Sequence, residues 1–282
     1  MQKSLRSHFA VFVLPTLAAF IVAFLIPFVM GIYLSFTEFT TISDATFVGF
    51  DNYVRAFWGD TDFLNALWFT AKFTVVSVIT VNLLAFLLAL MLTRGLKGTN
   101  LLRTVFFMPN LIGGIVLGYI WQVLLNGLLL GFGVDLTYSA TYGFWGLVIL
   151  MNWQMIGYMM IIYVAGIQNI PEELGEAASI DGASPLGRLR HVTLPLMAPS
   201  FTICTFLTLT NSFKLFDQNL ALTGGAPGKE TSMLALDIYQ TFYGRIGYEG
   251  VGQAKAVVFF LLVALIAFAQ LWLTRSREEE AV

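Results

Sequence analysis

The feature that most limits what this chain can fold into is a series of long runs without any charged residue. Six such runs cover residues 10–37, 73–93, 104–134, 136–171, 192–213 and 256–274. Because about 20 residues of α-helix cross the hydrocarbon core of a bilayer, each run is long enough to contain a membrane span. The 282 residues are 57% hydrophobic and only 11% charged, which is too little charge for a water-soluble domain. No run alternates polar and apolar residues as barrel strands do.

We therefore predict an all-α membrane protein with a single transmembrane domain over residues 1–282. The predicted spans are 10–36, 66–93, 104–126, 142–166, 198–222 and 256–274. Between the fourth and fifth spans, residues 169–197 form the largest connection on their side of the membrane. The lone Cys204 permits no internal disulfide, and a net charge of −2 gives no basic surface for nucleic acid.

The distribution of lysine and arginine among the connections predicts the orientation. Positive residues concentrate in cytoplasmic loops, and one side of this chain carries nine of them: Lys3, Arg6, Arg94, Lys97, Arg103, Arg188, Arg190, Arg275 and Arg277. The other side carries only Arg55, Lys229, Arg245 and Lys255. The nine-residue side is thus predicted to be cytoplasmic, with both termini inside.

The connection 169–197 is predicted to fold into two short helices. Pro171 and the two glutamates after it suit the first turn of a helix, and Gly182 suits its end. Ser184 is then a candidate N-cap, with Pro185 in the first turn of the second helix. The first helix would present small residues that let a partner backbone come close.

Within this connection, the sequence resembles the EAA loop of ABC importer permeases. Glu176-Ala177-Ala178 is followed after three residues by Gly182, and after nine more by Val192-Thr193-Leu194-Pro195. The one departure is Val192, where the family pattern has isoleucine. Three further segments, which begin at Val48, Pro109 and Phe216, resemble the sugar permeases related to the maltose and glycerol-3-phosphate systems.

The resemblance implies a type I ABC importer permease fold, six transmembrane helices with a cytoplasmic coupling helix. It implies that the coupling helix docks on a separate ATPase subunit through Glu176, Ala177, Ala178, Asp181 and Gly182. Asp181 can instead cap the helix, and the connection can simply join two spans. The implied partners are a second, related permease subunit, two ATPase subunits, an extracytoplasmic solute-binding protein and the lipid of a bacterial or archaeal cytoplasmic membrane.

The chain is not predicted to be an enzyme and is predicted to hold no cofactor. It lacks the G-x-x-x-x-G-K-[ST] phosphate loop, so ATP and Mg²⁺ would be bound by the partner ATPases. It also lacks the H-E-x-x-H and G-x-S-x-G patterns of an intramembrane hydrolase. The alternative from another class is an ion-gradient-driven secondary transporter or channel, which usually carries acidic residues at the midplane and inverted repeats. Here Asp217 is the only acid within a predicted span.

Polar residues inside the predicted fifth span are candidates for a substrate pathway. Asn211, Lys214 and Gln218 have the spacing of one helical face, and Asp217 is placed to pair with Lys214. Such a face offers the donors and acceptors that sugar hydroxyls need. The alternative is that Lys214 and Asp217 extend to the membrane surface as a structural pair.

Two residues of the fourth span are further candidates for the pathway. Asn152 can contact substrate or bond to a neighbouring helix, and Trp153 can stack on a sugar ring or serve as packing. Because the spans carry little positive charge, a neutral mono- or oligosaccharide is the expected substrate.

Overall fold

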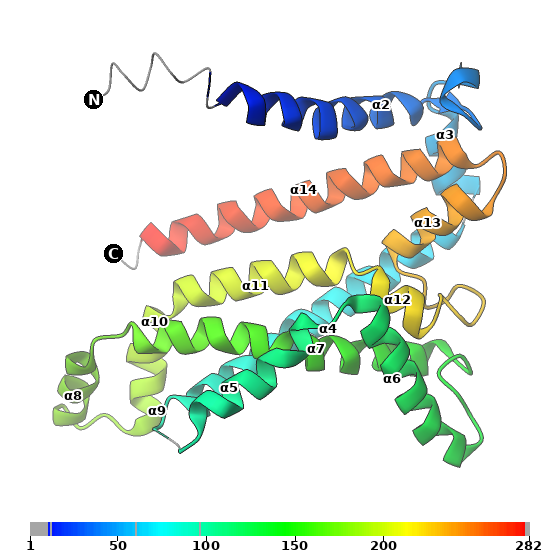
Figure 1. The fold of residues 1–282 in the computed structure, drawn as a ribbon. Helices are drawn as coiled ribbons and strands as arrows, with labels where there is room; N and C mark the ends of the chain where they lie inside the picture. Colours follow the sequence, from blue (N-terminus) through cyan, green and yellow to red (C-terminus); the bar gives the residue numbers. More distant parts are fainter. Residues whose placement is uncertain (1–10, 12, 60, 96, 280–282) are drawn as a thin grey trace. The chain divides into compact units, whose positions relative to one another are not determined.

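The computed structural model describes residue 11 and residues 13–59, 61–95 and 97–279, and they are almost entirely helical (Figure 1). By their internal packing they form two compact units. The first comprises the described residues up to Phe63 together with 238–260, and the second comprises 64–237 and the described residues from 261 onward. Helices α4 (Thr61–Leu92), α13 (Leu234–Gly244) and α14 (Glu249–Glu279) each continue from one unit into the other. The single domain over 1–282 stays a prediction.

The first unit begins with a helix over Val13–Leu34, which contains a π-helical stretch, η1 (Ile21–Leu25), and ends in α2 (Ile26–Leu34). A small antiparallel hairpin follows, with β1 (Thr37–Glu38) paired to β2 (Thr46–Phe47) across η2 (Ile42–Asp44). The chain then turns into α3 (Asp51–Val54) and η3 (Arg55–Gly59). In the hairpin, Asp44 accepts the backbone N–H groups of Thr41 and Thr40, which lowers the pKa of its carboxyl.

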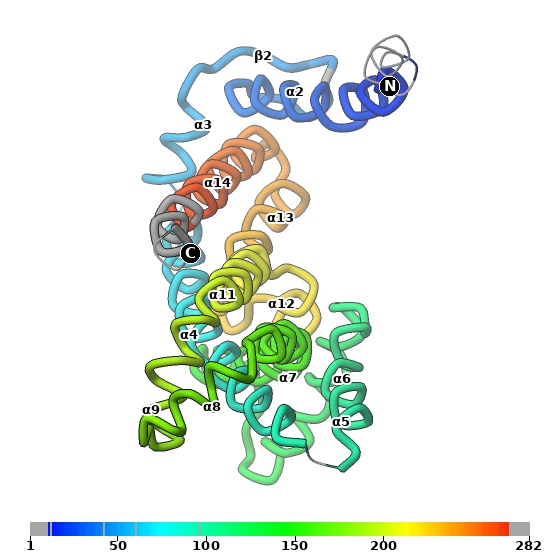
Figure 2. Tube along the Cα trace, turned by 90° about the vertical axis from the view of Figure 1, so that its left-hand side faces the viewer, coloured from blue at the N-terminus to red at the C-terminus, as the bar shows by residue number. Residues whose placement is uncertain are grey.

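The second unit contains the remaining helices. They are α5 (Thr99–Phe107), η4 (Met108–Leu111), α6 (Gly114–Leu129), η5 (Leu130–Phe132), α7 (Ala140–Gln168), α8 (Glu172–Ile180), α9 (Pro185–Arg188), η6 (Leu189–Thr193), α10 (Leu194–Leu196), α11 (Ala198–Phe213) and α12 (Asp217–Leu222). Figure 2 shows α5 and α6 beside α7.

Helix α7 is the most buried helix of the second unit, and glycines set its close contacts. A side chain at Gly157 would collide with the backbone of Phe106 on α5, and one at Gly166 would collide with Ser200 on α11. In a membrane, helices associate through such small residues because lipid gives no hydrophobic drive between apolar helices. The glycine pattern therefore fixes which helices contact α7.

Five described helices are long and apolar enough to cross a membrane: Val13–Leu34, Thr61–Leu92, Gly114–Phe132, Ala140–Gln168 and Glu249–Gln270. A sixth is formed by Ala198–Phe213 together with Pro185–Leu196, which are bent by 68° at the break between them. With that pair counted as one span, the described residues contain six helices that are long and apolar enough to span a membrane, the number that was predicted.

Two predicted span boundaries are wrong. The third span was expected over 104–126, but α5 ends at Phe107 and α6 begins only at Gly114. Pro109 cannot donate a backbone hydrogen bond, and Gly113 adopts an extended ψ of 140°, so the helix is interrupted between them. The fifth span was expected to continue to residue 222, but α11 ends at Phe213.

Candidate substrate pathway and coupling site

Gln154 is the middle residue of α7, the 29-residue helix from Ala140 to Gln168. At 1.5 Å per residue, about 21 Å of helix extends from Gln154 in each direction. This length exceeds half of a hydrocarbon core about 30 Å thick, so Gln154 lies near the bilayer midplane. Its side chain is only 9% exposed, and a buried amide in lipid requires a partner.

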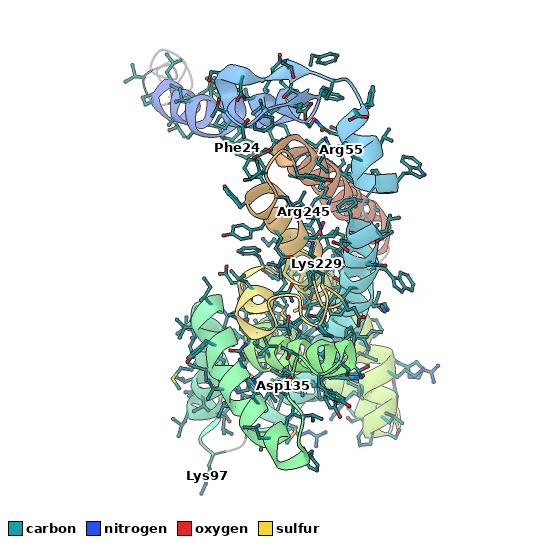
Figure 3. The ribbon with its side chains drawn as sticks, turned by 90° about the vertical axis from the view of Figure 1, so that its right-hand side faces the viewer. Phe24, Arg55, Lys97, Asp135, Lys229 and Arg245 are labelled. Carbon is teal, nitrogen blue, oxygen red and sulfur yellow. The ribbon has the colours of Figure 1, made fainter. Side chains whose placement is uncertain are left out.

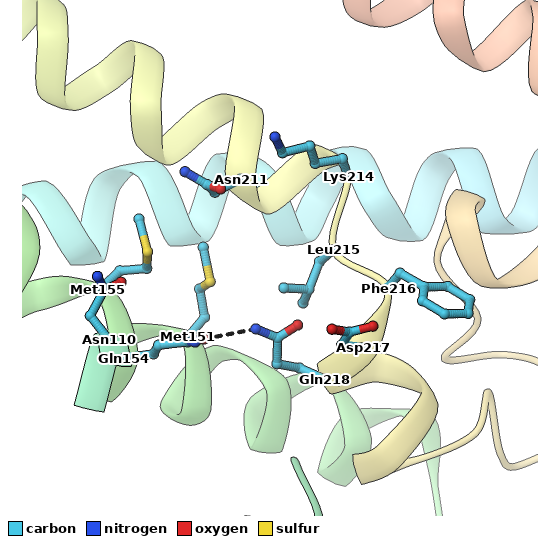
Figure 4. A pocket seen from close by; sticks show the side chains of 10 residues that line it. All are labelled: Asn110, Met151, Gln154, Met155, Asn211, Lys214, Leu215, Phe216, Asp217 and Gln218. Atoms are coloured by element: carbon cyan, nitrogen blue, oxygen red, sulfur yellow. Dashed lines mark hydrogen bonds between the residues drawn. The ribbon is translucent and has the colours of Figure 1, made fainter. Parts of the chain in front are cut away.

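The partner of Gln154 comes from a helix break. Helix α11 stops at Phe213, residues 214–216 are not helical, and α12 starts at Asp217. Gln218 in the first turn of α12 donates from Nε2 to Gln154 Oε1 over 2.8 Å (Figure 4). Interrupted helices near the midplane are a common way in which transporters build substrate sites.

A pocket of about 320 Å³ surrounds this amide pair. Its lining residues come from η4, the centre of α7, and both sides of the α11–α12 break: Asn110, Met151, Gln154, Met155, Asn211, Lys214, Leu215, Phe216, Asp217 and Gln218. Four carboxamide side chains among them present donors and acceptors, while the methionines and Leu215 add an apolar wall. The pocket can therefore hold a polar, uncharged molecule that also has apolar faces.

Two glycines of α6 hold α12 in place beside the pocket. A Cβ at Gly114 would stand 2.7 Å from the Cβ of Asp217, and one at Gly118 would stand 2.7 Å from the Cβ of Ala221. Both distances are shorter than any normal carbon contact, so only glycine permits this approach. Residues 109–114, PNLIGG, thus place Asn110 in the pocket and end at Gly114, where α12 packs closely against α6.

The structure brings together four of the six predicted pathway residues, Asn211, Lys214, Asp217 and Gln218, in this pocket. The expected single helical face is wrong, because the break at 214–216 separates Asn211 from Gln218. Asp217 was expected to pair with Lys214, but no salt bridge joins them and both side chains are exposed. Their pathway role stays a prediction.

The other two predicted pathway residues do not line the pocket. Asn152 donates from Nδ2 to Thr80 Oγ1 over 2.9 Å and to the Val148 carbonyl over 2.8 Å. Its amide thus makes the helix-to-helix bond that was one of the two predicted roles. Trp153 packs edge-on against Trp121, with ring centroids 5.6 Å apart.

Two residues that line the pocket, Gln154 and Asn110, were not among the predicted pathway residues. Gln154 was noticeable as an amide in an uncharged run, two residues after Asn152. Helical geometry alone does not say which of the two faces the α11–α12 break. Asn110 lies in η4, which was expected to be part of a continuous helix.

The predicted pair of helices in the connection 169–197 is confirmed. Helix α8 carries Glu172 and Glu173 in its first turn, and Gly182 follows its end with a φ of 80°. This left-handed conformation favours glycine. Ser184 caps α9 by accepting the backbone N–H of Gly187 over 3.1 Å. Asp181 is the C-cap residue of α8.

Helix α8 has one face toward α9 and one open face. On the inner side, Arg188 donates to Ser179 Oγ over 3.2 Å, and Ala178 is half-buried. Glu176, Ala177 and Ile180 are exposed on the other side, with Ile180 at 86%. Of the five predicted coupling residues, Ala178 is therefore the least accessible. Ile180 is an exposed apolar residue that the sequence argument did not select.

Comparison with known proteins identifies the family of the chain. Residues 81–279 match the family described as "Binding-protein-dependent transport system inner membrane component". The chain belongs to this family. It is thus an inner-membrane component of a binding-protein-dependent transport system and a multi-pass membrane protein. The matched range includes both the pocket and the connection 169–197.

Relatives of this binding-protein-dependent component cover almost the whole chain. A probable starch degradation products transport system permease protein, AmyD, of Thermoanaerobacterium thermosulfurigenes is 46% identical over 95% of the chain and 94% of its own length. The trehalose/maltose transport system permease protein MalF of Thermococcus litoralis is 31% identical over 95% of the chain and 93% of its own length. These family members are permease subunits of transporters.

A solved structure gives the same fold. A bacterial ABC transporter that imports the acidic polysaccharide alginate has a chain that matches with a TM-score of 0.82 at 20% identity, covering 98% of both chains. A second structure of an alginate transporter, in complex with a pentasaccharide-bound periplasmic protein, matches with a TM-score of 0.78. The predicted ABC importer permease fold is confirmed.

Proposed function

We propose that the chain is the permease subunit of an ATP-driven importer for a neutral sugar or oligosaccharide. The observation that carries this proposal is the midplane pocket with its Gln154–Gln218 amide pair. Amide groups offer donors and acceptors to hydroxyls, and methionine and leucine side chains pack against the apolar faces of a sugar ring. Relatives named for starch degradation products and for trehalose and maltose support the same substrate class.

The charges of the pocket favour a neutral substrate over an acidic one. The lining contains one cation, Lys214, and one anion, Asp217. A polyanion would be attracted by the first and repelled by the second, so the pocket offers no net charge to bind it. The proposed substrate is therefore not acidic, although the chain shares its fold with a transporter of the acidic polysaccharide alginate.

The exposed face of α8 is proposed to be the contact with a separate ATPase. Glu176, Ala177 and Ile180 form a compact patch, small enough at Ala177 for close approach of a partner. Asp181 and Gly182 follow at the end of the helix and set the turn into α9. Nucleotide and Mg²⁺ would be bound by two ATPase subunits, and their closure would move the spans through α8.

Further partners are proposed because one six-span subunit forms only part of a translocation path. One six-span subunit supplies one wall around the pocket, so a second permease subunit, a related sister, would supply the other. An extracytoplasmic solute-binding protein would deliver the sugar. The excess of basic residues around 94–103 and 188–190 supports a cytoplasmic location of α8, with both chain termini on that side.

The direct test is sugar uptake into vesicles that contain the chain with its co-purified subunits. Vesicles are loaded with ATP, and uptake of a radiolabelled maltooligosaccharide is measured with the binding protein outside. We expect uptake that requires ATP and continues after an uncoupler has collapsed ion gradients. Uptake that needs no ATP and stops with the uncoupler would instead establish the gradient-driven transporter.

A further inference from the structure

An exposed aromatic face lies on the helical segment that precedes α4. In this segment, α3 and η3 run without a break from Asp51 to Gly59. Asn52 and Ala56 are 1% and 0% exposed and form its inner side. Phe50, Val54 and Trp58 are 70%, 50% and 82% exposed; we call these three residues the aromatic face. So much exposed apolar surface requires a partner or a lipid environment.

The segment is fixed to the end of α2, so its exposure does not come from a loose loop. Asn52 donates from Nδ2 to the carbonyl of Thr37 over 2.8 Å and to that of Ser35 over 3.1 Å. The hydroxyls of Tyr53 and Ser35 lie 2.7 Å apart. Figure 1 shows α3 beside the end of α2. The position of α2 in the membrane therefore fixes the position of the aromatic face.

The end of α2 lies at the edge of the hydrocarbon core. The helix Val13–Leu34 has 22 residues, which gives a length of about 33 Å against a core of about 30 Å. No charged residue occurs between residue 10 and Thr37, and Glu38 is the first one that follows. Ser35 and Thr37, which hold Asn52, are thus at the boundary between the hydrocarbon and the headgroups.

Helix α14 independently places α3 and η3 at the same depth in the membrane. Gly250 packs closely against the carbonyl of Thr37 and the side chain of Asn52. The uncharged run of α14 begins at Ala256, about 9 Å further along the helix. A headgroup layer is about 5–8 Å thick on each side of the core, and any tilt shortens the 9 Å. Both helices therefore place α3 and η3 in the headgroup layer.

The side chains of the segment suit that layer. Trp and Tyr concentrate at membrane interfaces, and Trp58 is the most exposed residue of the aromatic face. Arg55, which Figure 3 labels, is on the same segment. Its guanidinium carbon lies 4.6 Å from the centroid of the Tyr248 ring, so its charge packs over an aromatic face. We propose that the aromatic face is a lipid-docking surface, which lies in the headgroup layer and holds this end of α2 to the membrane.

The test compares two labelled positions in the full-length chain, in the assembly in which it is isolated. Val54→Cys places a label on the aromatic face, and Ser43→Cys places one in the exposed hairpin between charged residues. Cys204 is fully buried and is left in place. Each variant carries an environment-sensitive fluorophore in vesicles of phosphatidylethanolamine and phosphatidylglycerol. Quenching is measured with lipids brominated near the headgroup and with aqueous iodide.

We expect bromolipid to quench the label at position 54 about twofold more than the label at position 43, and iodide to show the reverse order. Iodide quenching that is equal at both positions would mean that the face is in water. Quenching by neither agent at position 54 would mean that a protein covers it. Either result overturns lipid docking.

A second measurement does not depend on the label. Intrinsic tryptophan fluorescence of the unlabelled chain is compared with that of Trp58→Tyr in the same brominated vesicles. If Trp58 is in the headgroup layer, the variant loses a strongly quenched component of the emission. If the fraction of quenched emission is unchanged, Trp58 is out of reach of the lipid and the proposal fails.

Discussion

The hydroxyl of Tyr163 on α7 donates a 2.7 Å hydrogen bond to Oδ1 of Asn82 on α4. The amide of Asn82 in turn donates to Thr208 Oγ1 on α11 over 3.2 Å. One carboxamide thus joins three helices in the second unit. Asn82 and Thr208 each also donate to a backbone carbonyl of their own helix, those of Val78 and Cys204. The α7–α4 contact is repeated nearer the pocket by Asn152 and Thr80.

Tyr163→Phe should lower the stability of the protein. The variant removes one hydroxyl, leaves Asn82 Oδ1 without its donor, and changes the packing little. Hydrogen bonds between membrane helices contribute about 0.6–2 kcal/mol, so we expect a loss of about 1 kcal/mol, visible as a lower Tm in detergent. Tyr158→Phe is the matched control, since Tyr158 is on the same helix and its hydroxyl makes no hydrogen bond within the described residues. Equal Tm values for both variants would contradict the role of the Asn82 network.

Gly157→Ala should disrupt the contact between α5 and α7. A Cβ at this position would overlap the backbone of Phe106, and a backbone cannot turn aside as a side chain can. Overpacking of this kind costs about 1–3 kcal/mol. Gly127→Ala is the control in α6, where a Cβ meets nothing within 4 Å. We expect a lower Tm for the first variant and an unchanged or higher Tm for the second. A stable Gly157→Ala protein would show that the two helices are farther apart.

Gln218→Leu should reduce sugar uptake without loss of the protein from the membrane. The variant keeps the size of the side chain but removes the amide that bonds to Gln154, leaving that buried group unpaired. A lost hydrogen bond with an unpaired partner costs about 1–3 kcal/mol, which corresponds to an uptake rate about tenfold lower if the bond is made on the transport path.

Gln122→Leu is the control for the Gln218 prediction. Gln122 also makes one interhelical hydrogen bond, from Nε2 to the carbonyl of Leu222 over 3.1 Å, but it does not line the pocket. Uptake assays on equal amounts of both variants separate a pathway role from a general loss of packing. If the two variants lose uptake equally, the pocket has no special part in transport.

The sequence predicts the structure best where a residue acts through its own backbone conformation or through its nearest neighbours in the chain. Ser184, Pro185 and Gly182 predicted the caps and the turn between α8 and α9 because each acts through its own backbone conformation and nearest neighbours. The uncharged runs predicted the spans for the same reason, since lipid acts on every residue of a run. These elements need no knowledge of the rest of the fold.

The pocket could not be predicted in full because it depends on two helix breaks and on contacts between distant segments. The predicted span 198–222 contains no proline near residue 214, and the charge of Lys214 ends the uncharged run at Phe213 without predicting a break in the helix. The break brings Gln218 onto Gln154, 64 residues apart in the sequence. Likewise, only the position of Thr80 on α4 decides that Asn152 serves a helix contact while Gln154 serves the pocket.

Ile180→Ser should weaken the association of the chain with its ATPase. Ile180 is 86% exposed on the open face of α8, so the substitution should leave the fold of the chain unchanged. If a partner groove covers this face, losing the buried side chain costs about 1.5–3 kcal/mol, which lowers affinity at least about tenfold. The measurement is the amount of ATPase retained when the tagged chain is purified at increasing dilution.

Ile246→Ser is the matched control for the Ile180 prediction, because Ile246 is 93% exposed and lies on the predicted opposite side of the membrane. We expect the ATPase to dissociate from Ile180→Ser at dilutions at which Ile246→Ser and the unmodified chain retain it. Equal retention in all three samples would exclude Ile180 from the coupling surface and leave Glu176 and Ala177 as the candidates on that face.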